Sequence, residues 1–179
     1  MTSVTGFTLL VALVGAERIA ELVVARRNQA WARSRGGVEY GRGLYPGIVA
    51  AHVGLLGGAL LEVRLLDRPF IPLLGWSMLG LTVLAQGLRW WCIATLGRRW
   101  NTRVIIVPHL PLVDAGPYRR LRHPNYVAVV AEGIALPLVH TCWTTALVFT
   151  IVNLGLLRFR IRTENTALQY ATAPDAFGR

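Results

Sequence analysis

Residues 108–126 read PHLPLVDAGPYRRLRHPNY, and apolar sequence flanks this stretch on both sides. The stretch combines Pro108, Pro111 and Pro117 with a cluster of arginines, two histidines and two tyrosines. A polar, conformationally restricted segment beside membrane helices is costly to order unless it lines a cavity or lies at the interface. We therefore interpret this stretch as the part of the chain that holds a small charged molecule at a membrane surface.

The composition is that of a membrane protein with basic loops. The chain has 179 residues, 54% of them hydrophobic, and a mean hydropathy of +0.46. Its 19 basic residues are all arginine, and its formal net charge is +10. These arginines fall in the gaps between apolar runs, whereas a nucleic-acid binder gathers them on one soluble face. The pattern excludes nucleic acid as a partner and leaves membrane lipids as one.

Five separate apolar runs occur along the chain. A transmembrane helix needs about 20 predominantly apolar residues, and the candidate runs are residues 4–24, 44–61, 70–88, 127–139 and 143–157. The last two are short and are separated by three residues, which predicts a tight hairpin of tilted or partly interfacial helices. We predict an all-α membrane protein with about five transmembrane helices and a C-terminal helical hairpin.

The charge of the segments between the apolar runs predicts how the chain is oriented in the membrane. Residues 26–42, 89–122 and 158–162 are rich in arginine, whereas residues 62–69 are balanced in charge. Because basic loops stay on the cytoplasmic side, we expect the N-terminus outside and the C-terminus in the cytoplasm. Residues 104–107 form a short β-branched run that predicts one strand or extended segment.

Residues 122–126 open the fourth predicted helix. Pro124 suits the first turn, where a missing N–H costs nothing, and His123 and Tyr126 then face the same side. The positive end of the helix would point at a bound anion. An interfacial helix start, anchored by Arg, His and Tyr, explains the same residues, and the spacing leaves both interpretations open.

Glu132 lies inside the apolar run VAVVAEGIALPL. An ionisable residue in that setting is a functional candidate by default, and a helix–helix hydrogen bond to Asn153 is its structural alternative. Glu17, Arg18 and Glu21, near the end of the first run, are interpreted as interfacial charges that snorkel, with a face turned toward a polar cavity as the alternative.

Arg160 and Glu164 belong to the segment FRIRTEN and are helical i, i+4 neighbours. Such a pair is worth only a few tenths of a kcal/mol on a surface. At the mouth of the hairpin, the same pair would bind a zwitterion, with Arg taking a carboxylate and Glu an ammonium group.

LVDAGPYRRLRHPNY, a short apolar hairpin and FRIRTEN together resemble the integral-membrane isoprenylcysteine carboxyl methyltransferases and their bacterial relatives. The resemblance covers about residues 96–168. It implies that S-adenosylmethionine binds in a cytoplasmic pocket of residues 96–179, the cofactor-binding and catalytic part, while residues 1–95 form a membrane frame. It also implies methyl transfer to a lipophilic acceptor that enters from the bilayer of a bacterial cytoplasmic membrane.

The resemblance assigns roles residue by residue. Implied for the cofactor are Leu112, Val113, Gly116, Tyr118, Arg122, His123, Pro124, Tyr126 and Glu164. For catalysis, Glu132 is the candidate base or orienting group, and Arg160 and Arg162 would balance negative charge. No metal is implied, and the absence of a G-x-G-x-x-G after a strand excludes the soluble dinucleotide-type fold.

Two departures from the family pattern concern the acceptor. Asn165 replaces the second Glu of the family's acidic pair, and the chain ends at Arg179 without the longer tail of the eukaryotic enzymes. LGRRWNTRVIIVP is more similar to the bacterial branch associated with type III polyketide synthases, which implies an alkylresorcinol or alkylpyrone acceptor. An isoprenylcysteine-type carboxyl methyltransferase is the alternative enzyme, and a small membrane transporter or assembly subunit is the alternative of another class. The oligomeric state stays open.

Overall fold

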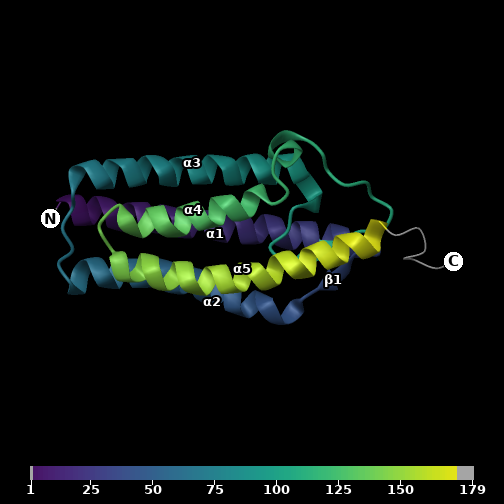
Figure 1. Cartoon of the computed structure of the whole chain (residues 1–179), viewed down its shortest axis with the longest axis horizontal. Helices are drawn as coiled ribbons and strands as arrows, with labels where there is room; N and C mark the ends of the chain where they lie inside the picture. The colour runs from purple at the N-terminus through teal and green to yellow at the C-terminus, as the bar shows by residue number, and fades with distance from the viewer. Residues whose placement is uncertain (1, 173–179) are drawn as a thin grey trace.

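Five long helices lie along one axis in the computed structural model, which describes residues 2–172 (Figure 1). The helices are α1 (Thr2–Ser34), α2 (Tyr45–Leu65), α3 (Pro72–Leu96), α4 (Pro124–Leu138) and α5 (Trp143–Thr172). The short elements are β1 (Val38–Tyr40), β2 (Val104–Ile106) and the 3₁₀ turns η1 (Arg42–Leu44), η2 (Gly97–Arg99) and η3 (Gly116–Arg119). The short elements gather at the end of the bundle opposite the N-terminus.

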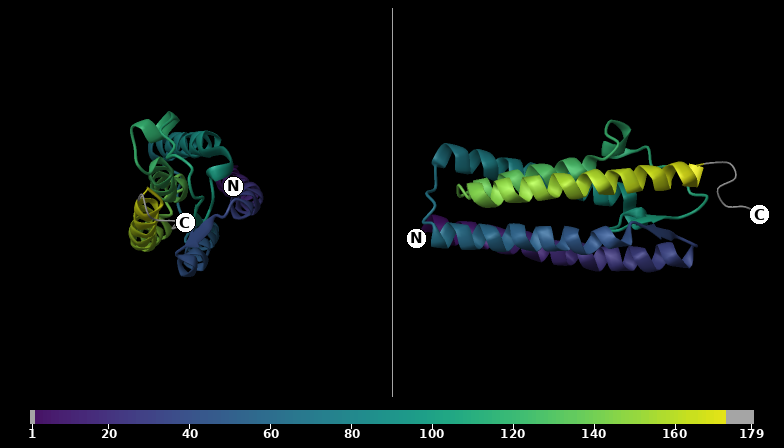
Figure 2. Two further views of the ribbon diagram at one scale, coloured as in Figure 1. Left: turned by 90° about the vertical axis from the view of Figure 1, so that its right-hand side faces the viewer. Right: turned by 60° about the horizontal axis from the view of Figure 1, so that its bottom comes forward.

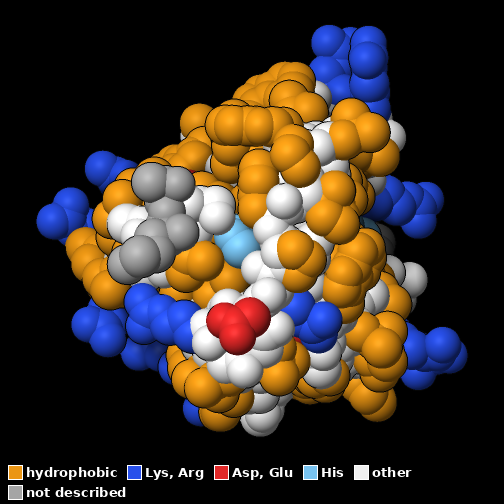
Figure 3. Space-filling view, turned by 90° about the vertical axis from the view of Figure 1, so that its left-hand side faces the viewer, with side chains coloured by type: hydrophobic (Ala, Val, Ile, Leu, Met, Phe, Trp, Pro, Cys, Tyr) orange, Lys and Arg blue, Asp and Glu red, His pale blue; other side chains and the backbone are white. Residues whose placement is uncertain are grey.

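Three helical stretches are long and apolar enough to cross a membrane. They cover residues 42–65, 72–99 and 143–169, among the residues that the structure describes. Hydrophobic side chains also cover much of the end of the molecule that carries the N-terminus (Figure 3). The chain is therefore an integral membrane protein of helical class, while the number of five spans and the orientation remain predictions.

Most of the helices run further than the apolar pattern predicts, and α1 and α5 exceed it by the most. α1 continues to Ser34 through the arginines that were expected to form a loop from residue 26. The Asn28 side chain donates hydrogen bonds to the backbone carbonyls of Gly97 (3.1 Å) and Trp100 (2.7 Å). These tertiary contacts stabilise the polar C-terminal half of α1. α5 is a single helix of 30 residues, which corrects the expectation of a short second hairpin helix.

The hairpin of α4 and α5 is confirmed, and its turn covers residues 139–142. Glu62, at the end of α2, stabilises the start of α5. Its carboxylate accepts bonds from the backbone N–H groups of Thr144 (3.1 Å) and Thr145 (2.7 Å) and from Arg68 Nε (3.0 Å). The carboxylate thereby satisfies N–H groups that a helix start leaves without intrahelical partners.

β2 confirms the predicted strand at residues 104–107, and its partner is a strand that the sequence pattern did not reveal. β1 pairs with β2 in antiparallel register, with Val38 opposite Ile106 and Tyr40 opposite Val104. This two-stranded sheet ties the segment after α1 to the segment after α3. It closes one end of an otherwise helical bundle.

The core lies where α1, α2 and α4 meet. Its buried side chains include Phe7, Val11 and Val14 of α1, packed with Val63 of α2 and Leu136 of α4. Figure 2 shows α4 and α5 side by side; α5 also packs against α2, and α4 packs against α3. Helices from both predicted parts of the chain, residues 1–95 and 96–179, therefore pack in one bundle.

Candidate functional site

The structure contains a cavity of about 200 Å³ at the end of the bundle that carries the small sheet. We call it the end cavity. Its walls come from the end of α3, from β2 and the loop that follows, and from the facing ends of α4 and α5. Predicted site residues at its wall are Leu112, Val113, Tyr118, His123, Tyr126, Arg160 and Glu164.

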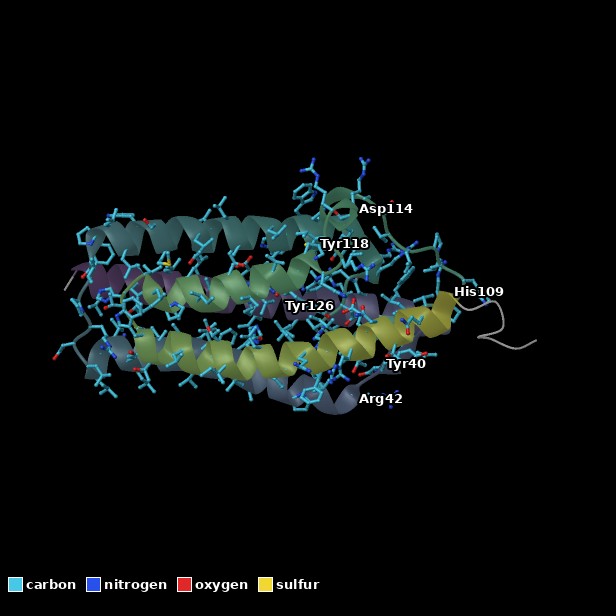
Figure 4. The ribbon with its side chains drawn as sticks, viewed as in Figure 1. Tyr40, Arg42, His109, Asp114, Tyr118 and Tyr126 are labelled. Carbon is cyan, nitrogen blue, oxygen red and sulfur yellow. The ribbon has the colours of Figure 1, made fainter. Side chains whose placement is uncertain are left out.

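The start of α4 forms one wall. Pro124 occupies the first turn of the helix, and His123 is its N-cap residue. The rings of His123 and Tyr126 stack, with centroids 5.3 Å apart and planes 20° apart. The prediction that these two side chains face the same side is confirmed. Both lie at the cavity, and Figure 4 shows Tyr118 and Tyr126 near this end of the bundle.

The Tyr126 hydroxyl joins the two sequence motifs. It donates a hydrogen bond to the Glu164 carboxylate and accepts one from Arg160 Nε at 2.9 Å. His123 Nε2 lies 3.1 Å from Asn165 Oδ1. Arg160 and Glu164 thus meet through a tyrosine from another helix, which places a cation and an anion side by side at the cavity wall.

Arg103 is a cavity residue that sequence reasoning missed. Its Nη1 lies 2.7 Å from Glu39 Oε1, and its guanidinium lies 4.4 Å from the ring centroid of Tyr45. Burial acts to raise the pKa of Glu39, but the hydrogen bond and charge of Arg103, with the charges of Arg42 and Arg33, hold that pKa below its usual value. Glu39, opposite β2 on the small sheet, therefore orients an arginine at the cavity.

Three buried polar atoms at the cavity have no hydrogen-bond partner among the described residues. They are Trp100 Nε1, Arg103 Nε and Asn125 Oδ1. A buried polar group without a partner costs about 1–3 kcal/mol, so these atoms fit a site that takes up a polar ligand. No place at a site was predicted for residues 98–103, because the pairing of β1 with β2 was not foreseen.

Tyr118 lines the cavity from η3, and burial, followed by the neighbouring Cys92 thiol, raises the pKa of its hydroxyl. Gly116 is the first residue of the same η3 turn, two residues before Tyr118, and has φ +52°. A Cβ there would lie 2.6 Å from Thr95 Oγ1 and 3.0 Å from Trp91 Nε1. The close approach that only glycine allows is therefore to α3, and it positions the turn that carries Tyr118.

Four further predicted residues lie outside the set that lines the cavity. Arg122 and Arg162 are exposed, whereas Pro124 is fully buried in the α4 start. Glu132 is 2% exposed and lies inside the bundle. The structure thus brings together seven of the twelve predicted residues, and of the three predicted catalytic residues only Arg160 lines the cavity.

Glu132 belongs to a group that we call the buried charge cluster, made of Glu17, Arg18, Glu21, Gln86, Arg89 and Glu132. Glu132 Oε2 lies 2.7 Å from Arg89 Nη2 and 3.1 Å from Arg18 Nη2. These arginines, rather than Asn153, are its partners. The interpretation of Glu17, Arg18 and Glu21 as snorkelling charges at a helix end is wrong, because α1 continues to Ser34 and these three side chains turn inward.

A helical membrane protein with a polar, partly charged cavity at one end of its bundle is the class that these features define. The family model described as "Isoprenylcysteine carboxyl methyltransferase (ICMT) family" matches residues 78–170, so the chain belongs to the isoprenylcysteine carboxyl methyltransferase family. Members of this family are membrane methyltransferases that use S-adenosylmethionine.

Two bacterial relatives match nearly the whole chain. "Uncharacterized protein YpbQ" of Bacillus subtilis is 37% identical over 164 residues, which cover 91% of this chain and 96% of the relative. An "Uncharacterized protein" of Haemophilus influenzae is 26% identical over 162 residues, covering 89% and 92%. No solved structure matches the chain. The similarity therefore extends to helices α1 and α2, outside the range of the family model.

Proposed function

We propose that this protein transfers the methyl group of S-adenosylmethionine to an acidic oxygen of a lipophilic acceptor, such as an alkylresorcinol or alkylpyrone, at the end cavity. The observation that carries the proposal is the Tyr126 hydroxyl between Arg160 and Glu164 at the cavity wall. Membership of the family supports the reaction type, and the exposed apolar helices support an acceptor that resides in the bilayer.

The residues present fit S-adenosylmethionine by charge and by hydrogen-bonding capacity. Glu164 offers an anion to an ammonium group, and Arg160 offers a cation to a carboxylate, which leaves Arg103 for the acceptor. Trp100 Nε1 and Asn125 Oδ1 offer a buried donor and acceptor. The volume of about 200 Å³ is below the roughly 300–1,000 Å³ of sites that enclose drug-sized ligands. Binding would therefore leave part of the cofactor exposed or displace the loop at Leu110–Val113.

S-adenosylmethionine supplies an electrophilic methyl group on a sulfonium, so the protein has to align an oxygen nucleophile with it. A carboxylate or acidic hydroxypyrone is already an anion, and a guanidinium at the wall stabilises it. A phenol, with a pKa near 10 as for tyrosine, would first have to release its proton to water, and Arg103 would stabilise the phenolate that remains. Because Glu132 is held by Arg18 and Arg89, we assign it to positioning helices rather than to accepting the proton.

The test is binding of S-adenosylhomocysteine, the demethylated product, to detergent-purified protein by calorimetry. Hydrogen bonds to charged groups contribute about 1.5–3 kcal/mol, so Glu164→Gln should weaken binding by at least tenfold. Arg158→Gln is the matched control, because Arg158 is exposed on the same helix and does not line the cavity, and it should bind as wild type does. A well-folded wild type that ignores the ligand would refute the methyltransferase and favour a transporter or assembly subunit.

A further inference from the structure

The turn that leads from η3 into α4 carries three arginines that do not line the end cavity. They are Arg119, Arg120 and Arg122, and all three residues are exposed. None of them forms an ion pair within residues 2–172. Asp114 is the single acidic residue of the sequence between positions 68 and 131. We call these three residues the turn arginines, a cluster of positive charge that the described part of the chain does not neutralise.

The turn lies against the end of α3. A Cβ placed on Gly116 of η3 would lie 3.0 Å from Trp91 Nε1, and Trp91 stands five residues before Leu96, the last residue of α3. α3 belongs to the stretch of residues 72–99, which is long and apolar enough to cross a membrane. Trp91 is 56% exposed, and tryptophan concentrates where the apolar core of a bilayer meets the headgroups. The turn arginines therefore lie at the level of the headgroups.

The turn arginines lie on the outside of the bundle. Figure 2 shows the chain between β2 and α4 standing out from the side of the bundle. In the view along the bundle, basic side chains, all of them arginine, project beyond the apolar outline of the helices (Figure 3). Leu121, which lies between the arginines in the sequence, is 44% exposed. An exposed leucine beside exposed cations, at the depth of the headgroups, presents both an apolar and a charged contact to a neighbouring lipid.

We propose that the turn arginines, together with Trp91, bind the headgroup of an anionic phospholipid, while Leu121 contacts its acyl chains. A guanidinium forms paired hydrogen bonds with phosphate oxygens, and basic residues beside a membrane attract anionic lipid. Inorganic phosphate would use the arginines but leave Leu121 and Trp91 without an apolar partner. An acidic soluble protein would have to displace the lipid that surrounds α3. Because none of these residues lines the end cavity, the site does not depend on the proposed methyltransferase function.

Other exposed arginines of the chain offer a matched comparison. Arg26 and Arg27 are exposed on α1, and Arg158 is exposed on α5. Replacing these three residues removes the same charge as replacing the turn arginines, but from two separate helices instead of one turn. A general attraction between a basic protein and anionic lipid would be weakened equally by both triple replacements. A site built by the turn would be weakened by only one of them.

The test measures lipid binding to the whole chain purified in detergent. Native mass spectrometry counts the phosphatidylglycerol molecules that stay bound and gives their dissociation constants, with phosphatidylcholine as the zwitterionic reference. The glutamine variant combines Arg119→Gln, Arg120→Gln and Arg122→Gln, and the control variant combines Arg26→Gln, Arg27→Gln and Arg158→Gln. A lysine variant replaces the turn arginines by lysine and so keeps their charge. A phosphatidylglycerol with a photoactivatable group beside its headgroup, followed by peptide mapping, locates the lipid on wild type without any replacement.

A basic residue close to an anionic membrane surface contributes roughly fivefold to binding. The glutamine variant should therefore bind phosphatidylglycerol at least about tenfold more weakly than wild type. The control variant and the lysine variant should stay within about threefold of wild type, and the photoactivatable lipid should label residues 116–123.

Equal losses in the glutamine and control variants would overturn the proposal, since they would indicate a general attraction instead of a site. Equal binding of phosphatidylcholine, or labelling outside the turn and the end of α3, would also overturn it. Displacement of the lipid by glycerol phosphate would show a site for small anions, and displacement by soluble polyglutamate would show a site for an acidic protein. Either displacement would exclude the phospholipid as the specific partner of the turn arginines.

Discussion

Replacing Glu132 by Gln separates a role in catalysis from a role in positioning helices. The Glu132 carboxylate accepts bonds from Arg89 Nη2 at 2.7 Å and Arg18 Nη2 at 3.1 Å. The amide keeps the volume and one acceptor oxygen but removes the charge. Charge-assisted hydrogen bonds are roughly twice as strong as neutral ones, so each bond should lose about 1 kcal/mol, or about 2 kcal/mol in total.

For a chain of this size, 1 kcal/mol corresponds to about 2–4 °C in unfolding temperature. We therefore expect Glu132→Gln to unfold about 4–8 °C lower than wild type in detergent. Measured well below that temperature, its affinity for S-adenosylhomocysteine should stay within about threefold of wild type, since Glu132 does not line the end cavity and about threefold corresponds to less than 1 kcal/mol.

Glu164→Gln provides the opposite control, because Glu164 lines the cavity and is partly exposed. It should lose ligand affinity with little change in unfolding temperature. General bases contribute about 10²–10⁴-fold to a rate. A Glu132→Gln protein with wild-type unfolding temperature but a methyl-transfer rate lowered a hundredfold would refute the reasoning and restore Glu132 as the base.

Two further predictions concern the ends of the bundle. Glu62→Gln weakens the cap that Glu62 forms on α5, so the free energy of unfolding should fall by about 1–2 kcal/mol, as for other lost caps, and the protein should unfold at a lower temperature. An unchanged thermal unfolding curve would show that the cap does not stabilise the hairpin. Because the folded pKa of Glu39 lies below its usual value of 4.5, its ionised form stabilises the fold above that pH, and the contribution disappears as pH falls through the folded pKa. Thermal unfolding of Glu39→Gln should therefore differ most from wild type above about pH 5 and converge in acid, and a difference that persists at low pH would contradict this.

Local chemistry in the sequence predicted the elements of the site but not their full arrangement. Pro124 at the first turn of α4 and the three-residue spacing of His123 and Tyr126 placed both side chains on one face, as the structure confirms. Helical spacing likewise placed Arg160 near Glu164. The Tyr126 hydroxyl between them could not be foreseen, because it depends on how α4 packs against α5.

The limits of the apolar pattern appear where polar residues are satisfied by tertiary contacts. The hydropathy pattern predicts that the first helix ends near residue 24, because arginines and Asn28 follow. In the structure α1 continues, because the Asn28 side chain bonds the carbonyls of Gly97 and Trp100. Similarly, nothing in the sequence around Glu39 indicated that its carboxylate would contact Arg103. Only the pairing of β1 with β2 brings it to Arg103.

By itself, the sequence determined that the chain is a helical membrane protein with a C-terminal hairpin and a polar segment before it, because hydropathy and proline placement act over a few residues. The tertiary structure alone decided that Glu132 binds Arg18 and Arg89 and that Arg103 lies at the end cavity. Each of these depends on contacts between helices far apart in sequence, and periodicity within one helix carries no information about the partner that it meets.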